Sequence, residues 1–137
     1  MKKNLIFFLA RFGFGGAGNS VYRLSSSLDK KKFNVNVICL NKCAYESKLK
    51  KKGVKVFKIK SKRAFFSIFK INKLLKIITI NYSKNIFISN INYTNILCAL
   101  FLNKKSDDKL IAIERTPFKE LEIYFGFVDY FKKLIIK

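Results

Sequence analysis

The chain has no histidine and no tryptophan, a single proline and three cysteines among its 137 residues. A structural zinc site needs four nitrogen or sulfur ligands. Without histidine, the odd set formed by Cys39, Cys43 and Cys98 has no metal-ligand spacing. We therefore expect no metal and no cofactor, and we interpret Cys39 and Cys98 as thiols of the core.

Long apolar runs are absent too. The longest, from Ile96 to Leu102, has seven residues, far short of the ~20 that cross a bilayer. The run from Leu5 to Ala10 follows Met1-Lys2-Lys3, as in a signal peptide, but Arg11 ends it, and a secretory signal has ~7–15 apolar residues in its centre. We therefore expect a cytoplasmic protein that can also associate peripherally with the inner face of the membrane.

Acidic residues are scarce, with eight against 29 lysines and arginines, so the formal net charge is +21 at pH 7. Such a charge attracts polyanions or anionic membranes and specifies no fold. AT-rich codons give the same bias, because lysine, asparagine, isoleucine, phenylalanine and tyrosine are all abundant. Both explanations stay open on the sequence alone.

Short apolar runs alternate with longer helical patterns along the chain. We predict strands at residues 4–10, 33–40, 54–60, 85–89 and 109–114. We predict helices at 19–30, 45–53, 64–79 and 93–103, and a mainly helical tail at 118–137. Strands that alternate with such helices indicate an α/β fold with a Rossmann-like parallel sheet flanked by helices.

In this fold class, ligands bind beyond the carboxyl ends of the strands. The strand-to-helix turns to inspect are therefore residues 11–19, 41–44, 90–93 and 115–118. There is no proline-, glycine- or serine-rich linker and no internal repeat. We therefore interpret residues 1–137 as a single domain.

Four of the six glycines lie between Gly13 and Gly18, after the first strand and before a helix for which Asn19 is the expected N-cap. The spacing matches the dinucleotide-binding fingerprint. That fingerprint also requires an acidic residue at the end of the second strand, where Asn41 and Lys42 follow instead. Lys42 would suit a 2′-phosphate only weakly, and the glycines can equally form nothing more than a tight turn.

The whole segment "LARFGFGGAGNSVYRLSSSLDKKKFNVNVICLN" resembles the start of retaining glycosyltransferases of the GT-B fold, of the glycosyltransferase family 4 type. The likeness continues in order along nearly all of the chain, through "YESKLKKKGVKVFKI", "SNINYTNILCALF" and "IAIERTPFKEL". It implies the N-terminal Rossmann-like half of a GT-B fold, which faces a second domain across a cleft.

In that family the Gly-Gly loop approaches the donor diphosphate and the acceptor, and the resemblance assigns this role to Gly15, Gly16 and Ala17. Many relatives have a charged residue next, where this chain has Gly18 and then Asn19. The resemblance therefore makes Asn19 an uncharged candidate for substrate binding.

Further substrate-binding candidates follow the later strands. Asn92 and Thr94 are polar residues at the fourth strand exit, either in the cleft or as a helix N-cap. The resemblance makes Arg115 the catalytic candidate that stabilises a phosphate or the leaving group, next to Glu114, because its guanidinium binds phosphate with two hydrogen bonds. The alternative is a structural ion pair with Glu114 or Glu120.

The resemblance implies the acceptor-side domain of an enzyme that moves a sugar from a nucleotide-sugar donor to a glycan or lipid-linked acceptor, without a metal. We expect this domain to be incomplete at residue 137, with the donor-binding C-terminal domain absent or supplied by a separate chain. Alone it is expected to be inactive. The spacing of Glu114 and Glu122 matches the family's E-x7-E motif only by coincidence.

The predicted helix 64–79 places Lys70, Lys73 and Lys76 on a ~120° arc, since successive residues turn by about 100°. A basic amphipathic helix can lie on an anionic membrane, whereas a helix that covers the sheet and exposes its lysines gives the same pattern. The alternative class for the whole chain is therefore a basic α/β domain that binds nucleic acid or an anionic membrane without catalysis. Dispersed lysines make nucleic acid the less expected partner.

Overall fold

The computed structural model describes residues 2–40, 42–61, 64–102 and 107–114. Within them, a five-stranded parallel sheet has the order β3-β2-β1-β4-β5, which confirms the predicted α/β, Rossmann-like class. The predicted helical tail, 118–137, lies outside the described residues. The strands are β1 (Lys3–Leu9), β2 (Phe33–Leu40), β3 (Lys55–Ile59), β4 (Asn85–Asn90) and β5 (Lys109–Ile113).

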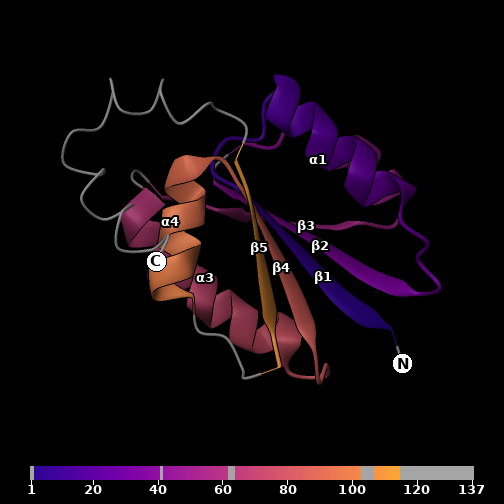
Figure 1. The fold of residues 1–137 in the computed structure, drawn as a ribbon. Helices are drawn as coiled ribbons and strands as arrows, with labels where there is room; N and C mark the ends of the chain where they lie inside the picture. The colour runs from indigo at the N-terminus through magenta and orange to yellow at the C-terminus, as the bar shows by residue number, and fades with distance from the viewer. Residues whose placement is uncertain (1, 41, 62–63, 103–106, 115–137) are drawn as a thin grey trace.

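Helices cover both faces of the sheet (Figure 1). The helices are α1 (Gly16–Ser27), α2 (Glu46–Lys51), α3 (Ala64–Thr79) and α4 (Asn92–Phe101). Val21 of α1 and Leu49 of α2 pack in one core, whereas Leu75 of α3 and Cys98 of α4 pack in the other.

The central strand β1 is buried on both faces, as a strand of a covered parallel sheet must be. Its odd residues, Leu5, Phe7 and Leu9, face the core under α1, and Ile6 and Phe8 face the core under α3 and α4. This explains why the first strand is a continuous apolar run in the sequence, whereas the edge strand β3 includes the exposed Lys55 and Lys58.

A row of buried asparagines joins three strands near the amino ends of β1 and β4. Asn4 Nδ2 donates to Asn85 Oδ1 at 2.7 Å and to the Ile78 carbonyl at 3.1 Å. Asn34 and Asn36 each donate to Asn4 Oδ1 at 2.8 Å. Because buried amides are costly unless they are paired, this network fixes the register of β2, β1 and β4.

Helix α1 begins earlier than predicted. Its N-cap is Gly15, and the Asn19 N–H already donates to the Gly15 carbonyl at 2.9 Å, so the prediction of Asn19 as N-cap was wrong. The glycines themselves form the first turn, because Gly18 sits against the Gly13 carbonyl oxygen where a Cβ would overlap it. Only glycine allows this close contact.

Candidate functional site

The candidate site lies at the carboxyl edge of the sheet, where β1 and β4 are neighbours but lead to helices on opposite faces. Parallel sheets bind ligands at such a switch point. Because β1, β4 and β5 are adjacent, the segments that follow them meet at this edge. The predicted residues whose backbone the structure brings to this edge are Gly15, Gly16, Ala17, Asn19, Asn92, Thr94 and Glu114.

The glycine loop after β1 leaves its backbone open. A Cβ at Gly13, Gly15 or Gly16 would meet nothing within 4 Å. These glycines also lack a positive φ, which among the described glycines only Gly53 has. Neither packing nor backbone conformation therefore requires glycine at Gly15 and Gly16.

The amino end of α1 begins at Gly16, directly after the glycine loop, and has no side-chain cap and no acidic residue in its first turn. The first N–H groups of any helix have no partner within the helix and carry partial positive charge. An anion that approaches Gly16 and Ala17 would therefore find backbone donors with no carboxylate beside them on α1.

Aromatic side chains stand beside the loop. Phe14 is 75% exposed and packs edge-on against Tyr45, with the ring centroids 5.3 Å apart. Tyr45 stacks on Tyr22 of α1 at 4.6 Å and also contacts Phe12. The sequence prediction missed Phe14, because an isolated phenylalanine in a glycine run gives no sign of whether it is buried. Its exposed ring offers an apolar surface to a planar or sugar ligand.

The exit of β4 contains unpaired buried polar atoms. Of the five buried side-chain polar atoms that lack a hydrogen-bond partner among the described residues, four belong to Ser89, Asn90 and Asn95. The Asn95 amide nitrogen does donate, to the Ile113 carbonyl at 3.1 Å. Such atoms call for an explanation, because most buried polar groups are paired.

The backbone is strained at the same place. Ile91 has φ +74° and is the one described non-glycine residue with a positive φ. A β-branched residue rarely adopts this conformation, and strain of this kind concentrates at functional sites. Ile91 is also the N-cap of α4, so the alternative prediction of Asn92 or Thr94 as N-cap was wrong. Our prediction named Asn92 and Thr94 here and missed Ser89, Asn90 and Asn95.

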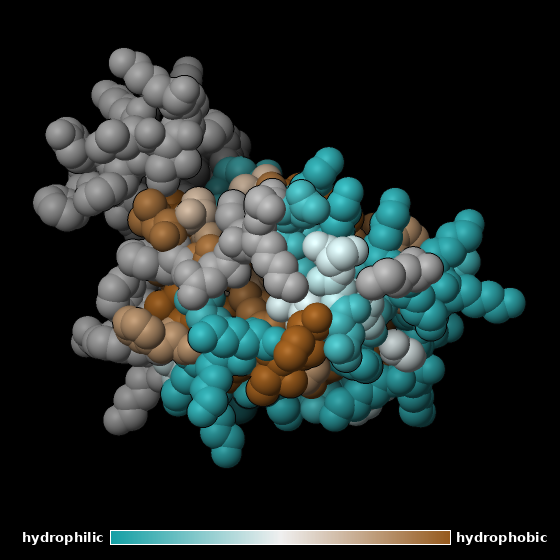
Figure 2. Space-filling model, turned by 90° about the horizontal axis from the view of Figure 1, so that it is seen from below, coloured by the Kyte–Doolittle hydropathy of each residue, from teal (hydrophilic) through white to brown (hydrophobic). Residues whose placement is uncertain are grey.

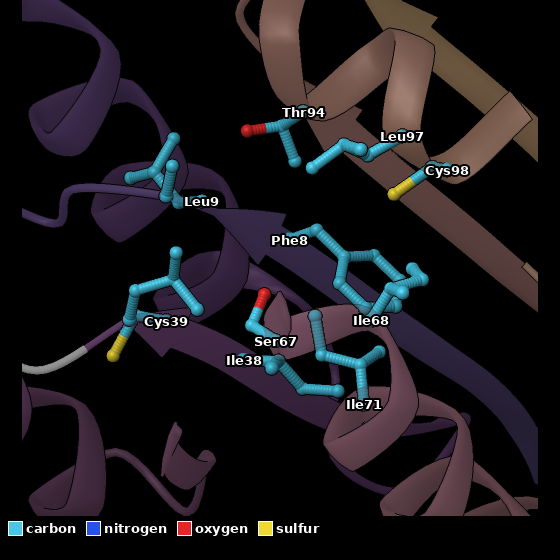
Figure 3. A pocket seen from close by; sticks show the side chains of 12 residues that line it. Phe8, Leu9, Ile38, Cys39, Ser67, Ile68, Ile71, Thr94, Leu97 and Cys98 are labelled. Atoms are coloured by element: carbon cyan, nitrogen blue, oxygen red, sulfur yellow. The ribbon is translucent and has the colours of Figure 1, made fainter. Parts of the chain in front are cut away.

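A small pocket opens between α3, α4 and the ends of β1 and β2 (Figure 3). Thr94 of α4 and Ser67 of α3 are polar groups on an otherwise mainly apolar wall. The cavity has a volume of about 20 Å³, which is room for about one water. This pocket is therefore too small for a nucleotide or a sugar. Its full lining is Phe8, Leu9, Ala10, Ile38, Cys39, Leu40, Ser67, Ile68, Ile71, Thr94, Leu97 and Cys98.

Two thiols meet near the exit of β2. Cys39 Sγ donates to the Phe57 carbonyl at 3.7 Å. The interaction between the two neighbouring thiols lowers the pKa of Cys43 and raises the pKa of Cys39. Cys43 lies next to the glycine loop, since it forms a parallel bridge with Phe12. Cys98, in contrast, is buried under α4, and burial raises its pKa to about 12.

Several residues predicted from the sequence lie away from this edge of the sheet or outside the described residues. Arg115 and Glu120 lie outside the described residues, and so does the turn 116–118. Glu114 is half-buried just after β5. Lys70, Lys73 and Lys76 are exposed on α3. Within the described residues, no group of three or more acidic, histidine or cysteine side chains is arranged to hold a metal ion.

Comparison of the chain with models of protein families, with curated proteins and with solved structures gave no match. The family resemblance is therefore a hypothesis that rests on the sequence motifs. Among the helices of the described residues, none is both long and apolar enough to cross a membrane.

Proposed function

We propose that this chain is the acceptor-side, Rossmann-like domain of a retaining glycosyltransferase of the GT-B type. In this proposal, the glycine loop and the amino end of α1 bind the phosphates of a nucleotide-sugar donor. The observation that carries it is the open backbone at Gly15 and Gly16. Glycines that neither packing nor φ requires are explained by a group that approaches the backbone closely, and the uncapped helix end favours an anionic one.

The neutral side chains at the β4 exit, Ser89 and Asn90, are fully buried. A ligand at this edge would therefore reach the backbone of the glycine loop and the Phe14 ring, and not the unpaired atoms of Ser89 and Asn90. Phe14 offers an apolar ring beside the loop. The uncapped end of α1 favours an anionic ligand, and the Phe14 ring offers a surface on which the apolar face of a sugar can pack.

In the proposed reaction, the bond between the anomeric carbon and the donor phosphate breaks, and a bond from that carbon to an acceptor oxygen forms on the same face of the sugar. The acceptor hydroxyl gives its proton to the departing phosphate oxygen, and the nucleoside diphosphate leaves with the electron pair of the broken bond. Backbone donors of α1 stabilise the departing charge, as does Arg115 if the resemblance holds. A second domain, in this or another chain, completes the donor site.

The proposed acceptor is a glycan or a lipid-linked carrier, and the proposed location is the inner face of the membrane. The charge of +21 supports an anionic surface as a partner, since basic residues near such a surface each favour binding. A basic α/β domain that binds nucleic acid or membrane without catalysis is the second candidate, favoured by the same charge.

A transfer assay tests the proposal. The chain is mixed with a candidate second-domain chain, a lipid extract and a panel of radiolabelled nucleotide sugars. We expect transfer that needs both chains and that falls about 100-fold with Gly16→Val, since small misplacements at a reacting centre cost that much. Ala99→Val, at an exposed position of α4, is the matched control, and this variant should transfer sugar as well as the unmodified chain. A Gly16→Val variant as active as the control would contradict the proposal, and a gel shift of duplex DNA in physiological salt would favour the second candidate.

A further inference from the structure

Helix α3 has one face in the core and one face in solvent. Its buried face includes Ile68, Ile71, Leu75 and Thr79. On the opposite side, three large apolar side chains are exposed: Phe69 at 72%, Ile77 at 67% and, just after the helix, Ile80 at 71%.

Three lysines occupy the same side. Lys70, Lys73 and Lys76 are exposed, and at about 100° per residue they lie on one ~120° arc together with the three apolar side chains. We call these six residues the α3 face: Phe69, Lys70, Lys73, Lys76, Ile77 and Ile80. Figure 2 shows apolar side chains surrounded by hydrophilic ones on the side of the molecule where α3 lies in Figure 1.

Phe69 is the most exposed of the three apolar side chains and stands among the lysines, not on the face that covers the sheet. An ordinary solvated helix face is polar throughout, so this pattern is not explained by contact with water alone.

We propose that the α3 face docks the protein on an anionic lipid bilayer. Phe69, Ile77 and Ile80 enter the boundary between headgroups and acyl chains, and the three lysines contact the lipid phosphates. The helix axis then lies parallel to the membrane plane, as in other interfacial amphipathic helices. This inference deepens the membrane association proposed above and names the surface that makes it.

Charge decides against a second copy of this chain as the partner. In a twofold-symmetric contact through the α3 face, Lys70, Lys73 and Lys76 would meet the same three lysines, and like charges repel. Lys70 Nζ already donates to the Lys60 carbonyl at 2.8 Å, which keeps its charge beside the start of α3.

Chemistry also decides against nucleic acid. Phosphates would match the lysines, but the aliphatic Ile77 and Ile80 have no partner on a sugar-phosphate backbone, whose contacts are polar. An anionic bilayer satisfies both kinds of side chain at once, because its surface is charged and its interior apolar.

Tryptophan fluorescence tests the depth of contact. The chain has no tryptophan, so the fluorescence of Phe69→Trp reports on the α3 face alone. Leu24→Trp, at an exposed position of α1, is the matched control. With vesicles of equimolar phosphatidylcholine and phosphatidylglycerol, we expect a blue shift and quenching by brominated lipid for Phe69→Trp only. Equal responses of the two reporters, or no response from Phe69→Trp, would overturn the proposal.

Charge variants test the lysines. Replacing Lys70, Lys73 and Lys76 together by glutamine should weaken vesicle binding about 100-fold in low salt, because each basic residue near an anionic surface contributes about fivefold. The control replaces the exposed Lys48, Lys51 and Lys52 by glutamine. This triple variant has the same net charge but changes α2, which packs with α1 on the other face of the sheet.

Equal weakening of vesicle binding by both triple variants would show that net charge alone causes binding and would overturn the proposal. Equally tight binding to vesicles of pure phosphatidylcholine would overturn it as well. Dimerisation or a duplex-DNA shift that depends on the α3 face would replace the lipid with another partner. Sugar transfer to a water-soluble acceptor should not change with the α3 variants, so failure of this inference is distinguishable from failure of the proposed transferase.

Discussion

Gly18, in the first turn of α1, lies directly against the carbonyl oxygen of Gly13, and a Cβ at residue 18 would overlap that oxygen. The contact seats the amino end of α1 on the loop that leaves β1. Gly18 is needed for this packing, whereas Gly15 and Gly16 face open space. The packing of Gly18 therefore holds the backbone of Gly15 and Gly16 at the edge of the sheet.

Gly18→Ala should therefore lower the free energy of unfolding by about 1–3 kcal/mol, the usual cost of overpacking. Gly16→Ala is the matched control, since it adds the same methyl group in open space, where alanine restricts the unfolded chain and helps the helix. Urea unfolding followed by circular dichroism measures both. Equal losses in the two variants would show that the contact between Gly18 and Gly13 is unimportant.

Asn4 is the centre of the buried amide network. Asn4→Ala removes two donors and one acceptor. It leaves Asn36 Nδ2 without its acceptor and Asn85 Oδ1 without its donor. We expect a loss of about 2–3 kcal/mol in the free energy of unfolding, since a buried polar group left unpaired costs that much. Asn81→Ala, at an exposed position, should change stability by less than about 0.5 kcal/mol. A loss at Asn4 no larger than at Asn81 would contradict the network.

The strain at Ile91 predicts an inverted order of stability. Alanine usually stabilises a protein relative to glycine. At φ +74° the order should reverse, so Ile91→Gly should be more stable than Ile91→Ala by about 1 kcal/mol. Both variants lose nearly the same side chain, and thermal unfolding compares them directly. An alanine variant that is the more stable of the two would rule out strain at this position.

The thiol pair predicts a pH dependence of alkylation. Because the neighbouring Cys39 side chain lowers the pKa of Cys43, Cys43 has more thiolate at neutral pH and should react with iodoacetamide before the other two thiols. Cys39→Ala removes this interaction and should raise the pKa of Cys43, which moves its alkylation profile to higher pH. Peptide mapping by mass spectrometry follows each thiol.

Cys98→Ala is the control for that experiment, because Cys98 lies in the other core and should leave the Cys43 profile unchanged. Burial raises the pKa of Cys98 to about 12, so Cys98 should be alkylated only when the protein unfolds. A Cys43 profile that is the same with and without Cys39 would show that Cys39 does not lower the pKa of Cys43.

Periodicity predicted the regular elements well. The strand 33–40 and the helix 64–79 have the predicted bounds, because an apolar β-branched run and a helical apolar pattern are both local signals. The start of α1 was predicted too late. A glycine run favours no helix by its propensity, and only the contact between Gly18 and Gly13, which the sequence does not show, explains why the helix includes it.

The candidate site was predicted in part. The edge of the sheet and the glycine loop follow from the order of strands and helices, which the sequence reveals. The unpaired atoms of Asn90 and Asn95, the strain at Ile91 and the exposure of Phe14 do not follow from it. Each of these features depends on which face of a helix or strand packs against residues that are distant in the sequence, and local sequence patterns do not specify that packing.

The most direct test of the central claim is a titration of the 15N-labelled protein with a panel of nucleoside diphosphates, followed by NMR. The account predicts saturable shifts of the amide signals of Gly15, Gly16 and Ala17 that are lost in Gly16→Val and kept in Ala99→Val. Shifts confined to surface lysines, equally large with inorganic phosphate and abolished by salt, would contradict a phosphate site at the glycine loop.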